Sequence, residues 1–461
     1  MKNSAPFKTL HVSLSLCLGL FASSTVQALD LMEAYRLAIS GDATFQAARA
    51  TAEAAREAVP QARAGLLPQV SATASRSKNN TVQTSPNVLR QEVSREYDYF
   101  ATSASINLRQ PLFRLGSLAH FYQAEAQVAA AEATLENDTQ LLALRVAGNY
   151  FDTLVAREKL DTIRIQKEAY AGQLASAERA LKAGFGTRTD IDEAQARLDM
   201  VAAQEIEARQ QLTVMEKTLA GVINQRIPAD QLARIDDARL QLEMPQPDNL
   251  EAWISRAEEN NPELRAIRHT IEVAERELDK GRAAHLPTLD LVASRSKSDS
   301  DSNNTIGNQY LTSSIGVQLN IPIFSGGQVN SVIRQARANL DKARQQHEAA
   351  RRQINVVIAR EFGAIEQGIA RVKALEQALR SAEQALNSTR KGVQAGTRNS
   401  IDVLNALQQA AAAQFQLAEA RTQYSVSRLK LKSAAGALSE QDIADVNRWL
   451  APGIARVAAS K

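Results

Sequence analysis

Residues 358–393 form the stretch IAREFGAIEQGIARVKALEQALRSAEQALNSTRKGV, in which an apolar side chain recurs at every seventh position. The repeating positions are Ile358, Ile365, Val372, Leu379, Leu386 and Val393. A strict seven-residue apolar repeat is typical of an α-helix in a left-handed coiled coil. No proline occurs between Phe324 and Ala395, or between Phe113 and Ala183. We therefore expect two uninterrupted helices of about 70 residues, each roughly 100 Å long at 1.5 Å per residue.

Two copies of one unit extend on either side of this pattern, over roughly residues 31–221 and 249–436. The pentapeptide Ala-Ser-Arg-Ser-Lys at 74–78 recurs unchanged at 293–297, an offset of 219. Further along the chain the offset falls to about 211. The decrease occurs between the two predicted strands, so we expect the first copy to have the longer loop there.

Each copy is predicted to contain a helix, two strands, a very long helix, a tight turn and a return helix. In the second copy, Ile315, Val317 and Leu319 alternate with polar or small residues, and this alternation predicts a strand with one apolar face. For the first repeat, at 29–248, we predict strands at about 69–77 and 97–112, a long helix at 116–183, a return helix at 189–221 and a linker at 222–248. For the second repeat, at 249–461, we predict strands at about 288–297 and 310–324, a long helix at 327–394, a return helix at 401–436 and a C-terminal tail. The polar segments 79–95 and 298–308 are predicted to be exposed loops.

The N-terminus has the features of an export signal. Lys2 and Lys8 precede an apolar run at 10–22, and small residues lie before position 29. This pattern predicts a signal peptide at 1–28, because the apolar run is too short to span a bilayer of about 30 Å. Leu16 precedes the single cysteine, Cys17, so we do not expect lipid attachment there.

The composition argues against several classes of function. Lys and Arg total 54 against 51 Asp and Glu, so binding of nucleic acid through bulk charge is not expected. The five histidines show no paired spacing, and no phosphate loop or nucleophile elbow is present. We therefore predict no enzyme activity, no catalytic residues, no metal site and no cofactor.

Four predicted strands per chain cannot close a barrel alone, since the smallest single-chain barrels have about 8 strands. An open sheet edge is not tolerated in lipid, because its N–H and C=O groups find no partner there. A soluble β-sandwich would show the same alternation, so the strand pattern alone leaves both possibilities open. Helices of roughly 100 Å extend far beyond a bilayer. Together with export, these features favour an oligomeric barrel in the outer membrane with a helical tube in the periplasm.

One motif of the first copy and four of the second are similar to those of the TolC family of outer-membrane efflux and type I secretion channels. They are Leu31-Met32-Glu33-Ala34-Tyr35, Leu286-Pro287-Thr288-Leu289-Asp290-Leu291, Pro322-Ile323-Phe324-Ser325-Gly326-Gly327, Ala395-Gly396-Thr397-Arg398 and Asp402-Val403-Leu404-Asn405-Ala406. The resemblance implies an α+β, mainly α chain whose four strands form part of a homotrimeric 12-strand transmembrane β-barrel, continued by a periplasmic α-helical barrel. It implies contact with outer-membrane lipid, and docking to a periplasmic adaptor and an inner-membrane ABC or proton-driven exporter.

The resemblance also assigns roles at the turns of the two long hairpins. It implies that Asp402 belongs to the ring lining the channel constriction, where Asn405 replaces the next acidic residue. It implies that Arg398 forms a latch between hairpins with Thr189 and Asp190, although Val393 stands where the latch has a tyrosine. The implied adaptor-docking residues at the hairpin tips are Gly184, Phe185, Gly396 and Thr397.

From the residues alone, the same positions fit ordinary helix-turn roles. Gly184 and Gly396 are suited to helix C-caps, Asp190 or Ser400 to an N-cap, and Arg398 to a solvated charge. Pairing the two glycines gives an offset of 212, whereas the two Gly-Thr-Arg motifs are 210 apart, so the register at the tip stays open by two residues.

The alternative function is that of a periplasmic coiled-coil adaptor or scaffold without a channel. An adaptor is expected to have one helical hairpin and usually an inner-membrane anchor. The two hairpin copies of this chain favour the channel. The exported substrate and the cognate transporter are not identified by these motifs.

Overall fold

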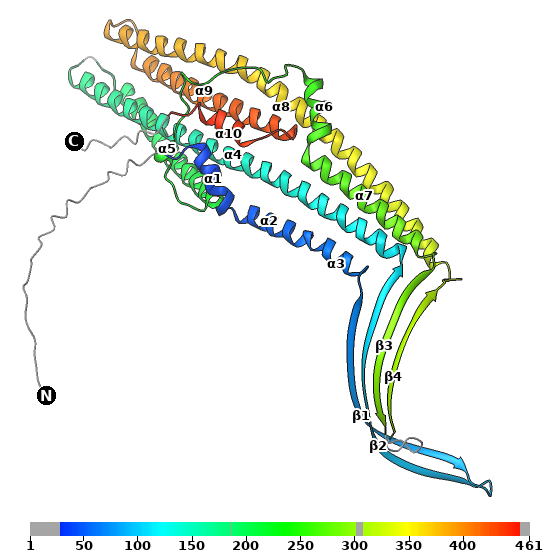
Figure 1. Ribbon diagram of the computed structural model, residues 1–461. Coiled ribbons are helices and arrows are strands. Elements are labelled where there is room, and N and C mark those ends of the chain that lie inside the picture. Colours follow the sequence, from blue (N-terminus) through cyan, green and yellow to red (C-terminus); the bar gives the residue numbers. More distant parts are fainter. Residues whose placement is uncertain (1–27, 185, 301–307, 452–461) are drawn as a thin grey trace, which may run out of the picture.

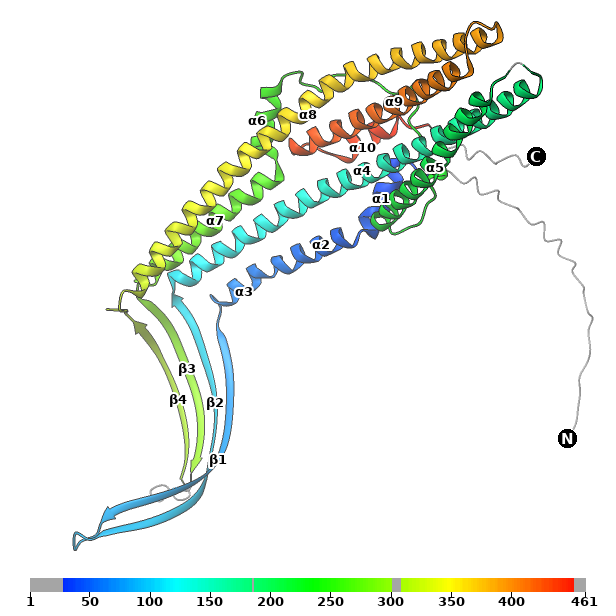
Figure 2. The same cartoon turned by 180° about the vertical axis from the view of Figure 1, so that it is seen from behind.

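The computed structural model describes residues 28–184, 186–300 and 308–451. Long helices lie side by side over most of the length of the molecule, and a curved sheet continues from one end of them (Figure 1). The turns of the helical hairpins lie at the opposite end, as the reverse view also shows (Figure 2). Apart from Ala28, the predicted signal peptide lies outside the described residues, and so does the predicted tip residue Phe185.

The two repeats contain the same series of elements. The first has α1 (Leu31–Gly41), α2 (Ala43–Arg56), α3 (Ala58–Ala64), β1 (Gln69–Pro86), β2 (Glu92–Phe113), α4 (Leu115–Lys182) and α5 (Arg188–Ile223). The second has α6 (Leu250–Asn260), α7 (Pro262–Ala283), β3 (Thr288–Ser300), β4 (Asn308–Asn320), α8 (Gln328–Gln394) and α9 (Ser400–Ala434), followed by α10 (Glu440–Asn447). The described part of the chain is mainly helical and has four strands in one sheet, which confirms the predicted fold class. None of the helices in the described ranges is both long enough and apolar enough to cross a membrane.

The helical segment that precedes the strands is interrupted at the same place in both repeats. Asp42 is the N-cap of α2, and its Oδ1 accepts a hydrogen bond of 2.7 Å from the N–H of Phe45. Asn261 is the N-cap of α7, and its Oδ1 accepts one of 3.0 Å from the N–H of Leu264. Both side chains satisfy a helix N–H that has no partner within its own helix, so each break begins a new helix.

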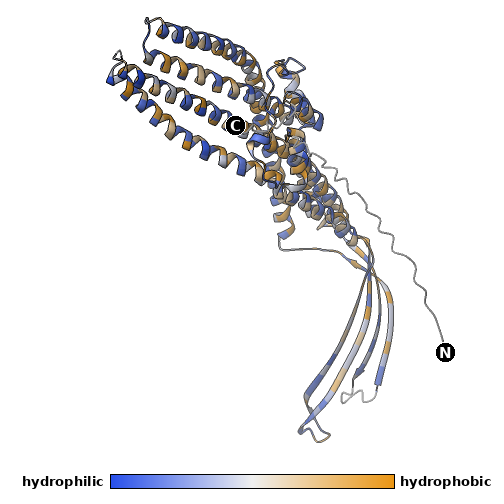
Figure 3. Ribbon diagram, turned by 90° about the vertical axis from the view of Figure 1, so that its left-hand side faces the viewer, coloured by the Kyte–Doolittle hydropathy of each residue, from blue (hydrophilic) through white to orange (hydrophobic). Residues whose placement is uncertain are grey.

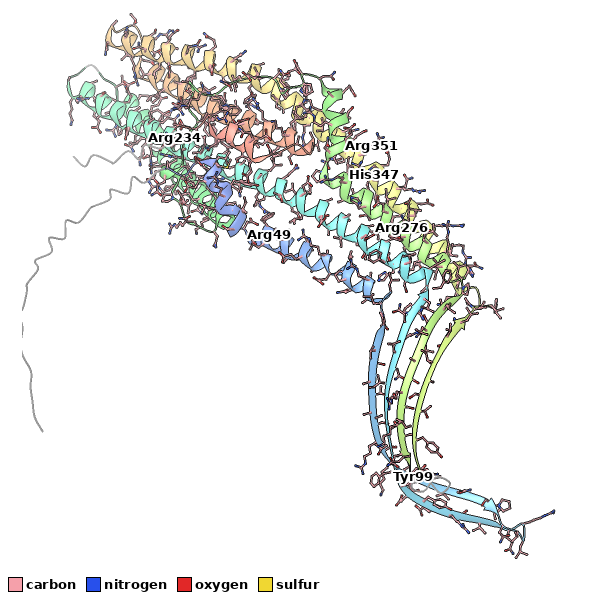
Figure 4. The ribbon with its side chains drawn as sticks, viewed as in Figure 1. Arg49, Tyr99, Arg234, Arg276, His347 and Arg351 are labelled. Atoms are coloured by element: carbon pink, nitrogen blue, oxygen red, sulfur yellow. The ribbon has the colours of Figure 1, made fainter. Side chains whose placement is uncertain are left out.

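The predicted loop at 79–95 is wrong. β1 and β2 remain paired through this segment as far as Pro86 and Glu92, and only a short turn joins them. The greater length of the first repeat therefore lies in longer strands. Most of its side chains are polar, which argued for a loop, but a strand pair that is exposed on both faces needs no apolar face. Figure 4 labels Tyr99 where this long hairpin bends away from the rest of the sheet.

The strands of the second repeat differ less from expectation. β3 continues to Ser300, so 298–300 is strand, and residues 301–307 of the predicted loop lie outside the described part of the chain. β4 ends at Asn320, before the predicted end at 324. Pro322 has no N–H for a strand ladder, and Gly326 and Gly327 turn the chain into α8 with φ of 59° and 80°.

The four strands form one antiparallel sheet in the order β1-β2-β3-β4. Residues paired across all four strands share a face, so the register defines rows. One face has apolar rows, of which Val70, Leu108, Ala293 and Ile315 form one. Its opposite has rows of hydroxyl and amide side chains, such as Ser71, Asn107, Ser294 and Ser314. Figure 3 shows hydrophobic and hydrophilic residues alternating along the strands. The sheet thus has one apolar and one polar face.

The main core lies midway along the helices, where the short elements pack against α4 and α9. Tyr150 of α4 is fully buried, and its hydroxyl oxygen lies 2.9 Å from the carbonyl oxygens of both Leu29 and Ala233. Burial raises the pKa of this phenol above its ordinary value. On α9, the hydroxyl of Tyr424 accepts a 2.9 Å hydrogen bond from the N–H of Glu243. These two tyrosines hold the N-terminal segment and the linker against the long helices.

A buried carboxylate joins the sheet to the helices. Asp290 of β3 is 3% exposed in its side chain. It accepts hydrogen bonds from Arg109 of β2, at 2.5 Å, and from Arg114 beside the start of α4, at 2.7 Å. Two charge-assisted contacts to one buried carboxylate fix the direction in which the strands pass into the helices. Sequence reasoning missed this cluster, because the arginines lie more than 170 residues from Asp290 in the chain.

Candidate functional site

The two hairpin tips have the same backbone construction. After α4, Gly184 has φ of 84°, and after α8, Gly396 has φ of 73°. Only glycine adopts this left-handed conformation without strain, and it satisfies the last carbonyls of the preceding helix. A Cβ at either glycine would meet no other atom within 4 Å, so the backbone angle alone accounts for the glycine.

Each return helix then begins with a reciprocal capping box. Its N-cap is Thr187 in the first hairpin and Asn399 in the second, so the expected N-caps Asp190 and Ser400 are wrong, and Asp190 is the third residue of its helix instead. In the first hairpin, the side chain of Thr187 accepts from the N–H of Asp190 at 3.2 Å, and Asp190 accepts from the N–H of Thr187 at 3.1 Å. In the second, Asn399 and Asp402 make the equivalent contacts at 2.9 and 3.3 Å. The caps and the positive-φ glycines therefore align at an offset of 212. The Gly-Thr-Arg match at 210 is a coincidence of letters, because its members occupy different positions in the two turns.

The structure does not bring the predicted latch residues together within one chain. Arg398 lies against Gly392, and its Nη1 is 3.9 Å from Oδ2 of Asp402 one turn along the same helix. In the described part of the chain, no hydrogen bond or ion pair joins Arg398 to Thr189 or Asp190. A latch between hairpins of neighbouring copies stays a prediction.

A different contact links the two hairpins near their tips. Arg197 of α5 donates from Nη2 to Oδ1 of Asn405 and from Nη1 to Oε1 of Gln408, both at 3.2 Å. The predicted constriction residue Asn405 is therefore bound to a guanidinium group. Sequence reasoning missed Arg197, because its pairing depends on how α5 and α9 are rotated toward each other.

The predicted docking residues are solvent-exposed in the single chain. Gly184, Gly396 and Thr397 lie on the exposed surface of the tips, and the hydroxyl of Thr397 donates to the carbonyl of Gly392 at 3.1 Å. The turns are thus accessible to solvent, and docking at these residues stays a prediction. In the described ranges, no group of three or more His, Cys, Asp or Glu side chains is placed to hold a metal ion.

Comparison with known proteins identifies the class. The family described as outer membrane efflux protein matches residues 34–225 and 253–437, one stretch in each repeat. The chain belongs to this family, and it is a protein of the outer membrane with a helical part in the periplasm.

Particular relatives support this. The chain is 34% identical over 446 residues to the outer membrane protein TolC of Vibrio cholerae, covering 96% of this chain and 98% of the relative. It is 33% identical over 418 residues to the alkaline protease secretion protein AprF of Pseudomonas aeruginosa, covering 90% and 86%. The solved CmeC outer membrane channel of Campylobacter jejuni superposes with a TM-score of 0.78 at 16% identity, covering 98% of each chain, and shows the shared fold. The resemblance to the TolC family is confirmed, and the relatives are channel and secretion proteins, not enzymes.

Proposed function

We propose that three copies of this chain form one channel that carries substrates across the outer membrane. The observation that carries the proposal is the four-stranded sheet, which has free edges at β1 and β4 and an exposed apolar face. Ile315 and Val317 on that face are 78% and 61% exposed. Pairing β4 of one copy with β1 of the next closes a barrel of three four-stranded sheets, and no strand edge is left in lipid.

The helices continue the channel into the periplasm. α4, α5, α8 and α9 form two antiparallel hairpins that lie side by side, so three copies supply six hairpins to a tube. In this arrangement the hairpin tips form the entrance. An adaptor protein would dock at Gly184, Gly396 and Thr397, and an inner-membrane ABC or proton-driven exporter would deliver the substrate.

The substrate belongs to type I protein secretion, drug efflux or both. AprF is named as a secretion protein for alkaline protease, and CmeC as an outer membrane channel. The wide match to the efflux family favours a conduit that does not itself select the cargo. A channel also explains two hairpins per chain better than an adaptor or scaffold does.

The entrance is gated by charged side chains of the tips. Three copies of Asp402 around one axis would bring like charges together, and Arg398 of one copy would meet Thr189 and Asp190 of its neighbour. The bridge from Arg197 to Asn405 and Gln408 holds the two hairpins of one copy together. With Val393 in place of the latch tyrosine, this internal bridge supplies part of the missing restraint.

Conductance across a planar bilayer tests the channel and its gate. The purified protein should form heat-sensitive trimers from the outer-membrane fraction and conduct ions. Asp402→Ala should reduce cation preference and relieve block by multivalent cations, because a ring of carboxylates attracts cations. Unchanged ion selectivity and unchanged cation block in Asp402→Ala would show that Asp402 does not line the constriction. A monomeric protein that conducts no ions would refute the proposed channel.

Docking has its own test. Cysteines introduced next to Gly184 and Gly396 should crosslink to the tips of the adaptor helices. Crosslinks confined to the linker at 222–248 would show that the adaptor docks at the linker and not at the tips.

A further inference from the structure

The proposed channel function does not account for the repeated pentapeptide. In β1 it covers 74–78, and in β3 it covers 293–297, with β2 between them. Because side chains alternate along a strand, its serines lie on the polar face and its basic residues on the apolar face. The register places Arg295 in one row with Ala72 and Ile106, and Lys297 in the next row with Ala74 and Ala104. The apolar face therefore carries the cations Arg76, Lys78, Arg295 and Lys297, and the carboxylates Asp98 and Asp299 lie on the same face.

These cations have few partners within the chain. Lys78 lies 3.9 Å from Asp98, at the limit of an ion pair. Arg76 lies over the ring of Phe100, with 4.8 Å from its Cζ to the ring centroid. Among the described residues, no carboxylate forms an ion pair with Arg76, Arg295 or Lys297. All three are exposed, so their charge is available to an anion outside the chain.

An apolar hollow lies beside two of the cations. It has a volume of about 400 Å³, and the small side chains of Ala72, Ala74 and Ala104 line it together with Ile106 and Leu311. Arg295 and Lys297 line the same hollow. Apolar walls next to cationic groups suit a molecule that carries an acyl chain and an anionic headgroup.

The position along the strands fits the outer leaflet. Leu289, near the helices, and Lys297 are separated by eight residues of β3, or roughly 27 Å at 3.4 Å per residue. With a strand tilt of about 40°, the height is roughly 20 Å, close to the apolar band of about 25 Å in outer-membrane barrels. Arg295 and Lys297 therefore lie near the end of the band away from the helices, and Arg76 and Lys78 lie beyond it. Long basic side chains reach from such positions to the headgroup layer.

We propose that the basic face of the two pentapeptides binds the phosphate groups of a phosphorylated lipid in the outer leaflet, with an acyl chain in the alanine-lined hollow. The inference rests on the proposed function for which face of the sheet meets lipid. Arginine binds phosphate through two parallel N–H···O bonds, and lysine adds a point charge. The pentapeptide is then kept in both strands because its alternation supplies hydroxyls to one face and phosphate ligands to the other.

The test uses the purified trimer in detergent and fluorescent lipopolysaccharide that carries its phosphates. The triple variant R76Q/R295Q/K297Q should bind this lipid about tenfold more weakly or worse, because three charge-assisted contacts are lost. Dephosphorylated lipopolysaccharide should bind the wild type and the triple variant equally. The control R95Q removes a cation from the opposite face of the same hairpin and should leave lipid binding unchanged.

Several outcomes would overturn the inference. Equal affinity of wild type and triple variant for the phosphorylated lipid would do so, and so would an equal loss in R95Q. Inorganic phosphate that displaces the lipid at equal concentration would show a free-anion site, contrary to the proposal. Conductance is recorded from the same preparations. A conducting wild type that binds no lipid refutes the lipid site alone, whereas a non-conducting wild type refutes the channel and leaves the binding result to be judged by itself.

Discussion

The two repeats have the same turns and caps but differ in the chemistry at matched positions. The N-caps Asp42 and Asn261 are both 4% exposed and bind the third N–H of their helices. Asp42 also forms a 3.0 Å ion pair with Arg145 of α4, whereas the Nδ2 of Asn261 donates at 2.8 Å to the carbonyl of Ala434 in α9. The cap geometry is common to both copies, and the neighbouring helix decides whether a carboxylate or an amide fits.

The largest expected effect comes from giving the second repeat the chemistry of the first. Asn261→Asp keeps the cap but replaces an N–H donor by a buried carboxylate facing the Ala434 carbonyl. An uncompensated buried charge should lower the free energy of unfolding by about 3–5 kcal/mol. Chemical denaturation measures it. Asn261→Ser, which keeps a cap without a charge, is the control, and equal losses in both variants would contradict the argument.

The apolar face offers a comparison between depths of one strand. Ile315→Arg near the middle of the proposed band should cost about 2–4 kcal/mol, whereas Leu311→Arg near its end should cost roughly 0–1 kcal/mol. The heat resistance of the trimer in lipid reports the difference. Equal tolerance of both substitutions would mean that this face does not meet the membrane.

The reverse exchange in the first repeat should be milder. Asp42→Asn keeps the cap, because asparagine and aspartate cap about equally well, but it removes the ion pair to Arg145. We expect a loss of about 1–2 kcal/mol, since Arg145 is partly exposed and water replaces part of the contact. Arg145→Ala combined with Asp42→Asn should show little further loss. If the stability losses of the two substitutions were fully additive, Asp42 and Arg145 would not interact directly.

The glycines of the two tips should respond alike. Gly184→Ala and Gly396→Ala each place a Cβ at positive φ, at a cost of about 1 kcal/mol. Local opening of each tip, measured by hydrogen exchange, should increase by the same factor. A clearly larger effect at one tip would show that the two turns, which align at an offset of 212 residues, are not structurally equivalent.

The smallest effect is the pH dependence of two ion clusters. Hydrogen bonds from Lys167 and Arg209 in the first hairpin hold the pKa of Glu205 below its ordinary value. In the second, hydrogen bonds from Arg351 and Arg352 lower the pKa of Glu348 to about 2. A carboxyl with a lowered folded-state pKa adds stability above its unfolded pKa and loses it as the pH falls through the folded value. The Tm difference between wild type and Glu348→Gln should therefore shrink from pH 4.5 to about 2. A Tm difference that stays constant over this pH range would show that the ionised Glu348 does not contribute to the pH dependence of stability.

The parts of the fold that follow a local rule were predictable. The heptads from Ile358 to Val393 and the absence of proline indicated the long helices, and the alternation around Val317 indicated a strand. The segment 79–95 was wrongly predicted to be a loop. A strand exposed to water on both faces lacks the alternation of apolar and polar residues by which a strand is recognised. The helix breaks at Asp42 and Asn261 were not predicted, although an asparagine before a proline, as at Asn261 and Pro262, is typical of a helix start.

The candidate site was predictable only where it depends on turns. Gly184, Gly396 and the two aspartates of the capping boxes lie in the predicted hairpin turns, since their spacing is local. The contacts of Arg197 with Asn405 and of Asp290 with Arg114 join distant parts of the chain. No local pattern identifies such partners, because they are set by the packing of helices and strands.

The polar face of the sheet has a consequence for transit through the proposed barrel. Between the rows of Ser71 and Ser75 its residues are uncharged, and several hydroxyls already bond one another across strands, as Thr73 with Ser105 and Ser75 with Ser103, both at 2.8 Å. A stretch of wall without charged side chains, and with some of its hydroxyls already paired, offers a passing chain weak contacts and no ionic one. Charged cargo of either sign would meet no ionic partner between these rows, so its transit through this stretch would depend on its width and on the driving exporter.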